Sequence, residues 1–254
     1  MADRPILFSG AMVKALLDGR KSQTRRAPPP DLQAAYTRAG DALLRRFPHQ
    51  RGAGYEVGDR LWVREALRYS DEHSNFYYAA DNRGVGNAIW ERLRGDVMKP
   101  AKSRPSIHMP RWASRITLLV TDVRIQRLQD ISEEDARAEG ATMRPACNGF
   151  QGRYDGWSMD WSRVGQPSKF ARNGVLAERD ISLSSARMAF ASYWNEINGG
   201  GAWDKNPWVT AVSFTTHLCN IDALPSAVTN RGSHDEPVSQ HAQRAPCVGA
   251  PNAG

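Results

Sequence analysis

The basic segment Gly19–Arg26 constrains the fold of this chain more than any other stretch. It follows an apolar-periodic segment that predicts a short helix over residues 10–18. Asp18-Gly19 predicts the end of that helix, because glycine accepts the left-handed conformation that a helix terminus needs. An apolar run at residues 5–9 predicts a strand before the helix. The chain is therefore predicted to open with a strand, a helix and a second strand, and the basic segment begins with the turn that leaves the helix.

The chemistry of this segment depends on which side chains share a face. In an extended strand, Thr24 lies on the face opposite Lys21, because successive side chains alternate. A lysine crowded by other cations has a lowered pKa and can act as the base that activates a threonine hydroxyl. The turn must bend if Lys21 is to reach Thr24. A basic edge strand exposed to solvent is the ordinary alternative.

Composition sets the class of protein and the class of partner. The 254 residues include 41% apolar residues, enough for a sizeable core, and carry a formal net charge of +7. Clustered Arg and Lys favour polyanionic partners. Three widely spaced cysteines predict neither a structural zinc nor a disulfide framework, and we expect no metal and no cofactor. The apolar runs are too short to cross a membrane, so we expect a soluble, cytoplasmic protein without a membrane partner.

The remaining regular elements follow from hydrophobic periodicity and from turn residues. In the longest predicted strand, Val120 and Val123 are out of phase, which indicates a β-bulge or a break between them. Ser132 followed by three acidic residues is typical of a capped helix start, and Gly140 ends that helix. The sequence predicts strands at residues 60–65, 75–80, 116–128 and 208–214, and helices at residues 131–139 and 184–198.

Three segments interrupt this pattern, and a tail follows it. Residues 28–54 contain a predicted basic helix, residues 81–104 show no clear period, and residues 141–180 are rich in Trp, Tyr, Arg and Gly. We interpret all three as insertions. Residues 218–254 lose periodicity and are rich in Pro, Ser, Asn and Gly, which predicts a disordered tail after a folded part at residues 1–217.

Five blocks in order resemble the ASCH-domain family, and most of all its long phage and prophage members. The blocks are Leu16–Arg26, Gly58–Glu65, Arg104–Ile116, Asp130–Gly140 and Asn206–Phe214. The resemblance implies an α+β fold of the PUA-like type, a small mixed β-barrel with short flanking helices. On this basis we expect one PUA-like domain at residues 1–217, interrupted by the three insertions, in the cytoplasm of a bacterial host cell.

The resemblance also implies a reaction. Small bacterial ASCH proteins remove the acetyl group from 4-acetylcytidine, and their G-R-K-x-x-T motif matches Gly19–Thr24 of this chain. By this resemblance, Lys21 is the proton acceptor, Thr24 the nucleophile and Glu139 the proton donor. A carboxylate in the last helical turn opposes the helix dipole, so without the resemblance Glu139 would be read as a solvent-facing residue.

Two other functions are kept open. A non-catalytic RNA- or DNA-binding module would use the same cations to bind phosphates, and a nuclease is the third candidate, although no carboxylate cluster at metal-binding spacing supports it. Trp62 is read more readily as a core residue, and His108 as a structural one. The candidate residues for binding a modified nucleoside or nucleic acid are Arg20, Arg25, Arg26, Trp62, Arg64, His108, Arg111 and Trp208.

Overall fold

The computed structural model describes residues 2–46, 54–94, 103–144, 156–159 and 183–224. Its centre is a five-stranded mixed sheet with the strand order β1-β3-β7-β10-β2. The first pair is parallel and the other three are antiparallel. These strands are β1 (Asp3–Leu7), β2 (Gln23–Arg26), β3 (Arg60–Arg64), β7 (Thr117–Arg127) and β10 (Trp208–His217).

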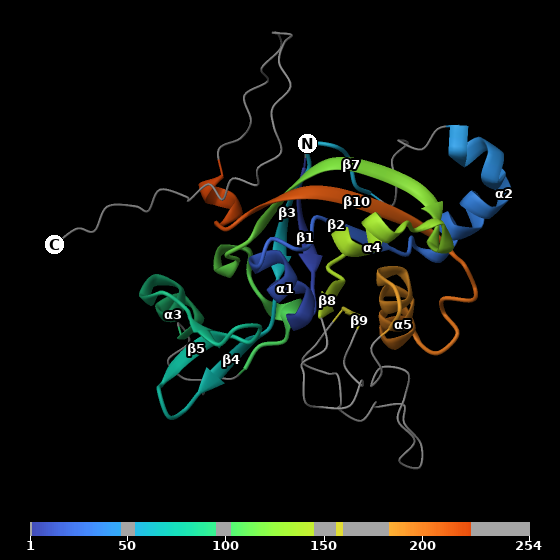
Figure 1. The fold of residues 1–254 in the computed structure, drawn as a ribbon. Coiled ribbons are helices and arrows are strands. Elements are labelled where there is room, and N and C mark those ends of the chain that lie inside the picture. Colours follow the sequence, from blue (N-terminus) through green and yellow to red (C-terminus); the bar gives the residue numbers. More distant parts are fainter. Residues whose placement is uncertain (1, 47–53, 95–102, 145–155, 160–182, 225–254) are drawn as a thin grey trace, which may run out of the picture.

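The two longest strands, β7 and β10, arch side by side across the molecule (Figure 1). Their register shifts where Ser213 faces Asp122 and Phe214 faces Val120, which leaves Thr121 as the extra residue of a β-bulge. The bulge keeps both Val120 and Val123 buried while Thr121 is exposed. The phase shift predicted from the sequence is therefore confirmed.

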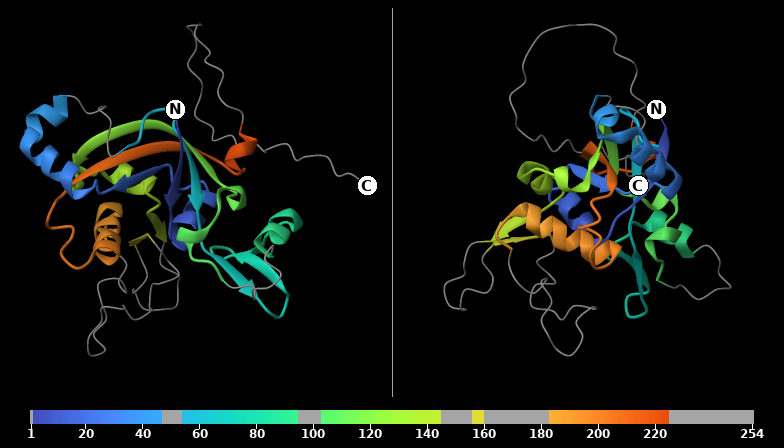
Figure 2. Two further views of the ribbon diagram at one scale, coloured as in Figure 1. Left: turned by 180° about the vertical axis from the view of Figure 1, so that it is seen from behind. Right: turned by 90° about the vertical axis from the view of Figure 1, so that its right-hand side faces the viewer.

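Helices cover the two faces of the sheet (Figures 1 and 2). One core contains Phe8, Val13 and Leu16, with α1 (Gly10–Leu17) packed over it. The other core contains Ala136 and Phe190, from α4 (Glu133–Ala138) and α5 (Ala186–Asn198). A third helix, α2 (Pro30–Arg46), packs beside Trp208 at one end of β7 and β10.

The helix termini follow the sequence signals closely. Ser9 caps α1 and Ser132 caps α4 through side-chain oxygens that accept backbone N–H groups. Gly19 and Gly140 follow the two helices with φ of 71° and 112°, the conformation that favours glycine. α5 begins two residues later than predicted, because Ser185 is its cap.

A smaller lobe stands apart from the main sheet (Figure 1). It combines a three-stranded sheet with one helix, and Leu67, Phe76 and Met109 lie in its core. Of its elements, only the strand at residues 75–80 was predicted. The lobe consists of β4 (Leu67–Ser70), β5 (Asn75–Tyr78), β6 (Arg83–Gly84), α3 (Asn87–Arg94) and the 3-10 helices Ser106–His108 and Arg111–Ala113.

A partly buried charged group, which we call the arginine clamp, joins the lobe to the main sheet. It consists of Glu65, Tyr78, Asp81 and Arg115. The Arg115 guanidinium donates to both Glu65 oxygens at 2.8 and 2.9 Å and to both Asp81 oxygens at 2.9 and 3.0 Å. The same guanidinium lies 3.9 Å from the centre of the Tyr78 ring. Its charge and its donors are thus matched by fixed partners.

The predicted α+β class is confirmed, but the predicted closed barrel is not found among the described residues. Strands β1 and β2 are the two edges of the five-stranded order. Across the seam between these edges, Arg26 Nη2 donates to Leu7 O at 2.6 Å. A side chain therefore bridges a position that a closed barrel would fill with a strand ladder.

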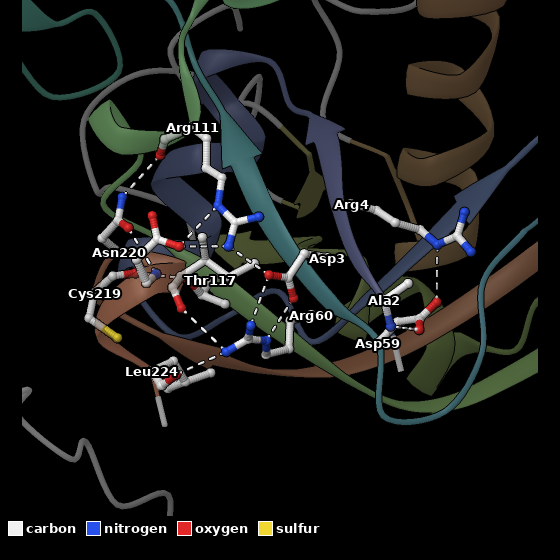
Figure 3. A network of polar contacts seen from close by, with 12 residues as sticks. Ala2, Asp3, Arg4, Asp59, Arg60, Arg111, Thr117, Cys219, Asn220 and Leu224 are labelled. Carbon is white, nitrogen blue, oxygen red and sulfur yellow. Dashed lines mark hydrogen bonds and ion pairs between the residues drawn. The ribbon is translucent and has the colours of Figure 1, made fainter. Parts of the chain in front are cut away.

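The predicted tail boundary is wrong by seven residues. Residues 218–224 dock against the body, where Thr117 Oγ1 donates to Cys219 O at 2.9 Å and Ile221 is fully buried. Figure 3 shows the polar contacts that hold this segment. Asn220 Nδ2 donates to Ser114 O at 2.8 Å, and Arg60 Nη1 donates to Leu224 O at 2.9 Å. The predicted disorder of residues 225–254 lies outside the described residues.

The predicted insertions coincide only in part with the described elements. α2 accounts for the helix predicted in residues 28–54, and α3 gives residues 81–104 a helix that the sequence did not predict. In residues 141–180, the described parts form a two-stranded sheet of β8 (Thr142–Arg144) and β9 (Gly156–Ser158). Residues 47–53, 95–102, 145–155 and 160–182 lie outside the described part. None of the described helices has the length and apolar character needed to cross a membrane.

Candidate active site

The backbone places the basic turn between the ends of two helices. After Gly19, the N–H groups of Arg20 and Lys21 both donate to Ala15 O, at 2.9 and 3.1 Å. The next residue, Ser22, donates its N–H to Ala138 O at 2.8 Å. The turn therefore wraps the end of α1 and contacts the end of α4. The bend directs Lys21 toward Glu139.

Lys21 and Glu139 form a buried pair across these two helix ends. Lys21 Nζ donates to Glu139 Oε2 at 2.7 Å and to Glu139 O at 2.9 Å. The side chains are 0% and 2% exposed. Glu139 is the C-cap residue of α4, so the carboxylate that opposes the helix dipole is held in place by a buried cation.

Arg25 contacts the same carboxylate from the neighbouring strand. Its Nη1 donates to Glu139 Oε1 at 3.2 Å and to Gln23 Oε1 at 2.6 Å. Its Nη2 donates to Asp135 Oδ2 at 2.7 Å. Asp135 and Glu139 are four residues apart on α4, so one guanidinium spans two carboxylates on one helix face. We call Lys21, Arg25, Asp135 and Glu139 the lysine cluster.

Burial and charge together shift the proton affinity of Lys21. Burial lowers the pKa of the Lys21 amine, the Glu139 carboxylate acts in the opposite direction, and Arg26 and Arg25 lower the pKa further. The net direction is downward from 10.5. Lys21 is therefore closer to the neutral, basic form at physiological pH than an ordinary lysine.

Thr24 lies beside this cluster on the opposite face of β2. It is 1% exposed and pairs with Val212 of β10. Arg26 is two residues further along the same face, with its guanidinium 5.0 Å from the centre of the Phe8 ring, and the Lys21 amine lies 5.6 Å from that ring. Within the described part of the chain, no hydrogen bond joins the Thr24 hydroxyl to Lys21 or Glu139. Two of the three predicted catalytic residues are thus in direct contact, and Thr24 is not bonded to them.

The two other arginines of the basic segment close the site on either side. Arg20 donates to Gly140 O at 2.9 Å and to Asp18 Oδ2 at 3.0 Å. Arg26 bridges to Leu7 O across the seam of the sheet. Burial lowers the pKa of Arg26, while Tyr55 and Glu139 act in the opposite direction. Both guanidinium groups have partners within the protein.

The remaining predicted binding residues do not join the lysine cluster. Trp62 is half-buried on the outer side of β3, with the Arg64 guanidinium 5.4 Å from its ring centre. Arg64 also donates to Ile107 O, beside the exposed His108. Arg111 donates to Asp3 and Asp222 at 2.6 Å each, in the network of Figure 3.

Trp208 is a predicted binding residue whose position rules out base stacking in this conformation. It is 1% exposed and lies in the core beside Tyr36 and Ile125. The Arg127 guanidinium also covers it, 4.3 Å from the ring centre. A ring enclosed in this way has no free face on which a base could stack. The physical cause is strand position, because Trp208 begins β10 on an inward-facing side.

Sequence reasoning missed the role of Asp135. The acidic first turn of α4 was ascribed wholly to helix capping and to the helix dipole, yet Asp135 also binds Arg25 and accepts from Arg124 Nη2 at 3.2 Å. The spacing of four residues between Asp135 and Glu139 was the available signal. Arg25 was named as a ligand-binding cation, whereas the structure gives it internal partners.

Comparisons with family models, with curated proteins and with solved structures found no match for this chain. Among the described residues, no group of three or more His, Cys, Asp or Glu side chains is placed to hold a metal ion. The chemistry of the lysine cluster itself is therefore the basis for a functional proposal.

Proposed function

We propose that this chain is an amide hydrolase of the ASCH family with a PUA-like fold, and that it removes the acetyl group of 4-acetylcytidine or of a similar acylated nucleoside. The single observation that carries the proposal is the buried contact of 2.7 Å between Lys21 Nζ and Glu139 Oε2. Amide hydrolysis needs a base, an acid and a nucleophile. In this proposal Lys21 is the base, Glu139 is the acid, and Thr24 on the following strand β2 is the nucleophile.

The reaction begins with attack by the Thr24 hydroxyl oxygen on the amide carbonyl. The neutral Lys21 amine accepts the hydroxyl proton as the carbon–oxygen bond forms, and this proton then crosses the short contact to Glu139. Glu139 donates it to the nitrogen of the leaving amine as the carbon–nitrogen bond breaks. The free nucleoside and an acetyl ester on Thr24 result.

Water completes the cycle by attacking the acetyl ester. Lys21 accepts a proton from the water and returns a proton to the Thr24 oxygen as the ester bond breaks. Acetic acid leaves, and the threonine hydroxyl and the neutral amine are restored. The lowered pKa of Lys21 supports this role, because a base must be largely unprotonated to accept a proton at neutral pH.

The burial of the cations argues against a site that only binds phosphate. The Lys21 and Arg25 side chains are both 0% exposed and paired with carboxylates. A phosphate-binding segment keeps its cations free to displace counterions from a polyanion. Thr24 is also 1% exposed, so the proposed reaction requires a local opening that admits the acetyl group.

The test is incubation of the purified protein with 4-acetylcytidine and, separately, with unmodified RNA, followed by liquid chromatography and mass spectrometry. We expect cytidine and acetate from the first substrate and intact RNA from the second. Thr24→Val keeps the shape of the side chain but removes the nucleophile, and Ser22→Ala removes an exposed hydroxyl of the same turn as a matched control. Release of cytidine by Thr24→Val at the wild-type rate would contradict the proposal.

Binding to RNA or DNA without catalysis is the second candidate. The half-buried Arg64–Trp62 pair on the outer side of β3 supports it, because an arginine beside an aromatic ring suits base stacking and phosphate contact. This function predicts an affinity that falls steeply between about 50 and 200 mM salt. Trp62→Ala should then weaken binding, while Thr24→Val should leave it unchanged.

A further inference from the structure

The lysine cluster extends outward as a ladder of alternating charges. From the inside outward, the order is Lys21, Glu139, Arg25, Asp135, Arg124 and Asp122, and each neighbouring pair is joined at 2.7–3.2 Å. Side-chain exposure rises along this order from 0% at Lys21 to 34% at Arg124 and Asp122. The middle members, Arg25 and Asp135, have no assigned part in the proposed reaction.

Arg25 fixes the orientation of the Glu139 carboxylate. It occupies Oε1, so Oε2 is the oxygen left to face Lys21. Gln23 and Asp135 in turn hold the two ends of the guanidinium at 2.6 and 2.7 Å. A group held by hydrogen bonds on several sides has little rotational freedom, which is how supporting residues keep a reactive pair aligned.

Charge balance around Lys21 depends on the same two residues. The charged groups that act on the Lys21 amine are Glu139 at the end of α4 and Arg25 and Arg26 on β2. The neighbours from α1 and from the segment after β1 are the uncharged residues Ala15 and Phe8. Asp135 partly neutralises Arg25, and Arg124 and Asp122 lie further out. Removing Arg25 or Asp135 therefore changes the charge near Lys21 in opposite directions.

Resting on the proposed function, we propose that Arg25 and Asp135 are positioning residues, which hold Glu139 toward Lys21 and set the balance of the proton between the two. Neither residue touches the substrate in this proposal. The reacting groups must then approach the cluster from the Lys21 side of Glu139, because Arg25 blocks the other oxygen.

Two substitutions separate this role from a merely structural one. Arg25→Gln removes a cation, so the Lys21 ammonium should hold its proton to higher pH than in the wild type. Asp135→Asn leaves Arg25 without its counter-charge, so Lys21 should lose its proton at lower pH. A contribution to stability alone would give both variants the same sign in thermal melting and no opposed effect on the titration.

The experiment is an NMR titration of the Lys21 side-chain nitrogen in protein labelled with nitrogen-15 lysine, with the signal assigned by its loss in Lys21→Met. It needs no substrate, so it is independent of whether the chain is a hydrolase. We expect opposite displacements of the titration in Arg25→Gln and Asp135→Asn. Asp122→Asn, at the outer end of the ladder, is the matched control and should give a much smaller displacement.

The second readout is the pH profile of kcat/KM on 4-acetylcytidine. Its acid limb should move up in Arg25→Gln and down in Asp135→Asn, with about a tenfold change in rate on that limb for each pH unit of movement. Arg25→Lys keeps the cation and should restore the wild-type limb in part. If Arg25→Gln does not fold, the single variants Arg25→Lys and Asp135→Asn are compared with each other instead.

Displacements of the same sign in both variants, or an Asp122→Asn effect as large as that of Asp135→Asn, would overturn the positioning role. Opposite displacements without hydrolysis in the wild type would uphold the charge ladder and contradict the proposed function. Hydrolysis by the wild type without opposite displacements would uphold the proposed function and contradict the positioning role.

Discussion

Two groups of cations and carboxylates, each containing one buried glutamate, differ in how many cations contact that glutamate. In the arginine clamp, one guanidinium binds two carboxylates through four contacts of 2.8–3.0 Å. In the lysine cluster, Lys21 and Arg25 share Glu139, and Arg26 adds a third cation nearby. The first group has one cation for two carboxylates, whereas the second has two cations for the carboxylates of Glu139 and Asp135, with Arg26 as a further cation nearby.

The proton affinities follow from this difference. Burial alone would lower the pKa of Arg115, but Glu65 and Asp81 outweigh it and raise that pKa. Burial lowers the pKa of Lys21, and Glu139 does not restore it. Two carboxylates around one guanidinium raise its pKa, while burial and neighbouring cations lower the pKa of the Lys21 amine. The comparison teaches that burial of charge alone does not mark an active site.

Removal of the central cation should have the largest effect, and the loss should be larger in the arginine clamp than in the lysine cluster. Arg115→Met leaves the buried Glu65 carboxylate without its cation, so we expect a loss of about 3–5 kcal/mol in the free energy of unfolding. Lys21→Met leaves Glu139 Oε1 paired with Arg25 but removes the partner of Oε2, and its cost should be smaller, about 1–3 kcal/mol. Urea unfolding of both variants measures the contrast, and equal losses would break the comparison.

Gly140→Ala should disturb the lysine cluster while leaving the arginine clamp intact. Gly140 has a φ of 112°, and an added Cβ would lie 3.1 Å from the Ala15 Cβ and 3.8 Å from the Lys21 Cβ. Strain at a position with positive φ costs about 1–3 kcal/mol. Thermal melting should record this loss, and the Lys21 titration should move with it. Gly199→Ala, where an added Cβ meets nothing within 4 Å, is a control for the strain of positive φ alone.

At alkaline pH, the change of stability with pH should have opposite signs for Lys21 and for Tyr78. Because the pKa of Lys21 is lowered from 10.5, the unfolded chain binds more protons than the folded chain below that pH, and stability should rise as pH approaches 10.5. Burial raises the pKa of Tyr78 to about 12, so the folded chain holds its proton longer and stability should fall above pH 10. Each contribution has a maximal slope of about 1.4 kcal/mol per pH unit.

Lys21→Met should remove the rise and Tyr78→Phe should remove the fall, as measured by urea unfolding between about pH 8 and pH 11. Retention of the rise in Lys21→Met would show that another group causes it. Retention of the fall in Tyr78→Phe would show that a group other than Tyr78 causes it.

The smallest effect is expected at the network of Figure 3, where arginines also pair with carboxylates but several of these side chains are exposed to solvent. Burial would raise the pKa of Asp3, but Arg60 and Arg111 outweigh it and lower that pKa below 3.8. Arg111 and Asp222 are 37% and 59% exposed. Solvent screens such pairs, so Arg111→Ala should cost about 1 kcal/mol or less. A larger loss in urea unfolding would mean that the docking of residues 218–224 depends on this arginine.

The sequence predicted the helix ends that meet at the lysine cluster, while Lys21 and Glu139 were named through the resemblance to the ASCH family and Asp135 was not named at all. Gly19 and Gly140 mark the helix ends that bring Lys21 and Glu139 together, and glycine at such ends is a local signal. Arg25 and Asp135 are 110 residues apart, and their contact exists only because α4 docks against β2. No local pattern encodes that docking, so Arg25 was read as a free cation.

The errors in the fold have similar causes. β4 spans only Leu67–Ser70 and α3 only Asn87–Arg94, lengths at which periodicity carries little information. Residues 218–224 are held mainly through Ile221 and through backbone carbonyls, which composition does not reveal. By contrast, the long alternation of β7 showed both the strand and its bulge.

The most direct test of the central claim is the rate of 4-acetylcytidine hydrolysis by Lys21→Ala, by Glu139→Gln and by the double variant. If Lys21 and Glu139 act as one unit, each single variant should lose about a thousandfold or more in kcat/KM, and the double variant should lose little beyond that. Circular dichroism should show that all three remain folded. Full turnover by Glu139→Gln, or losses that multiply in the double variant, would contradict the account.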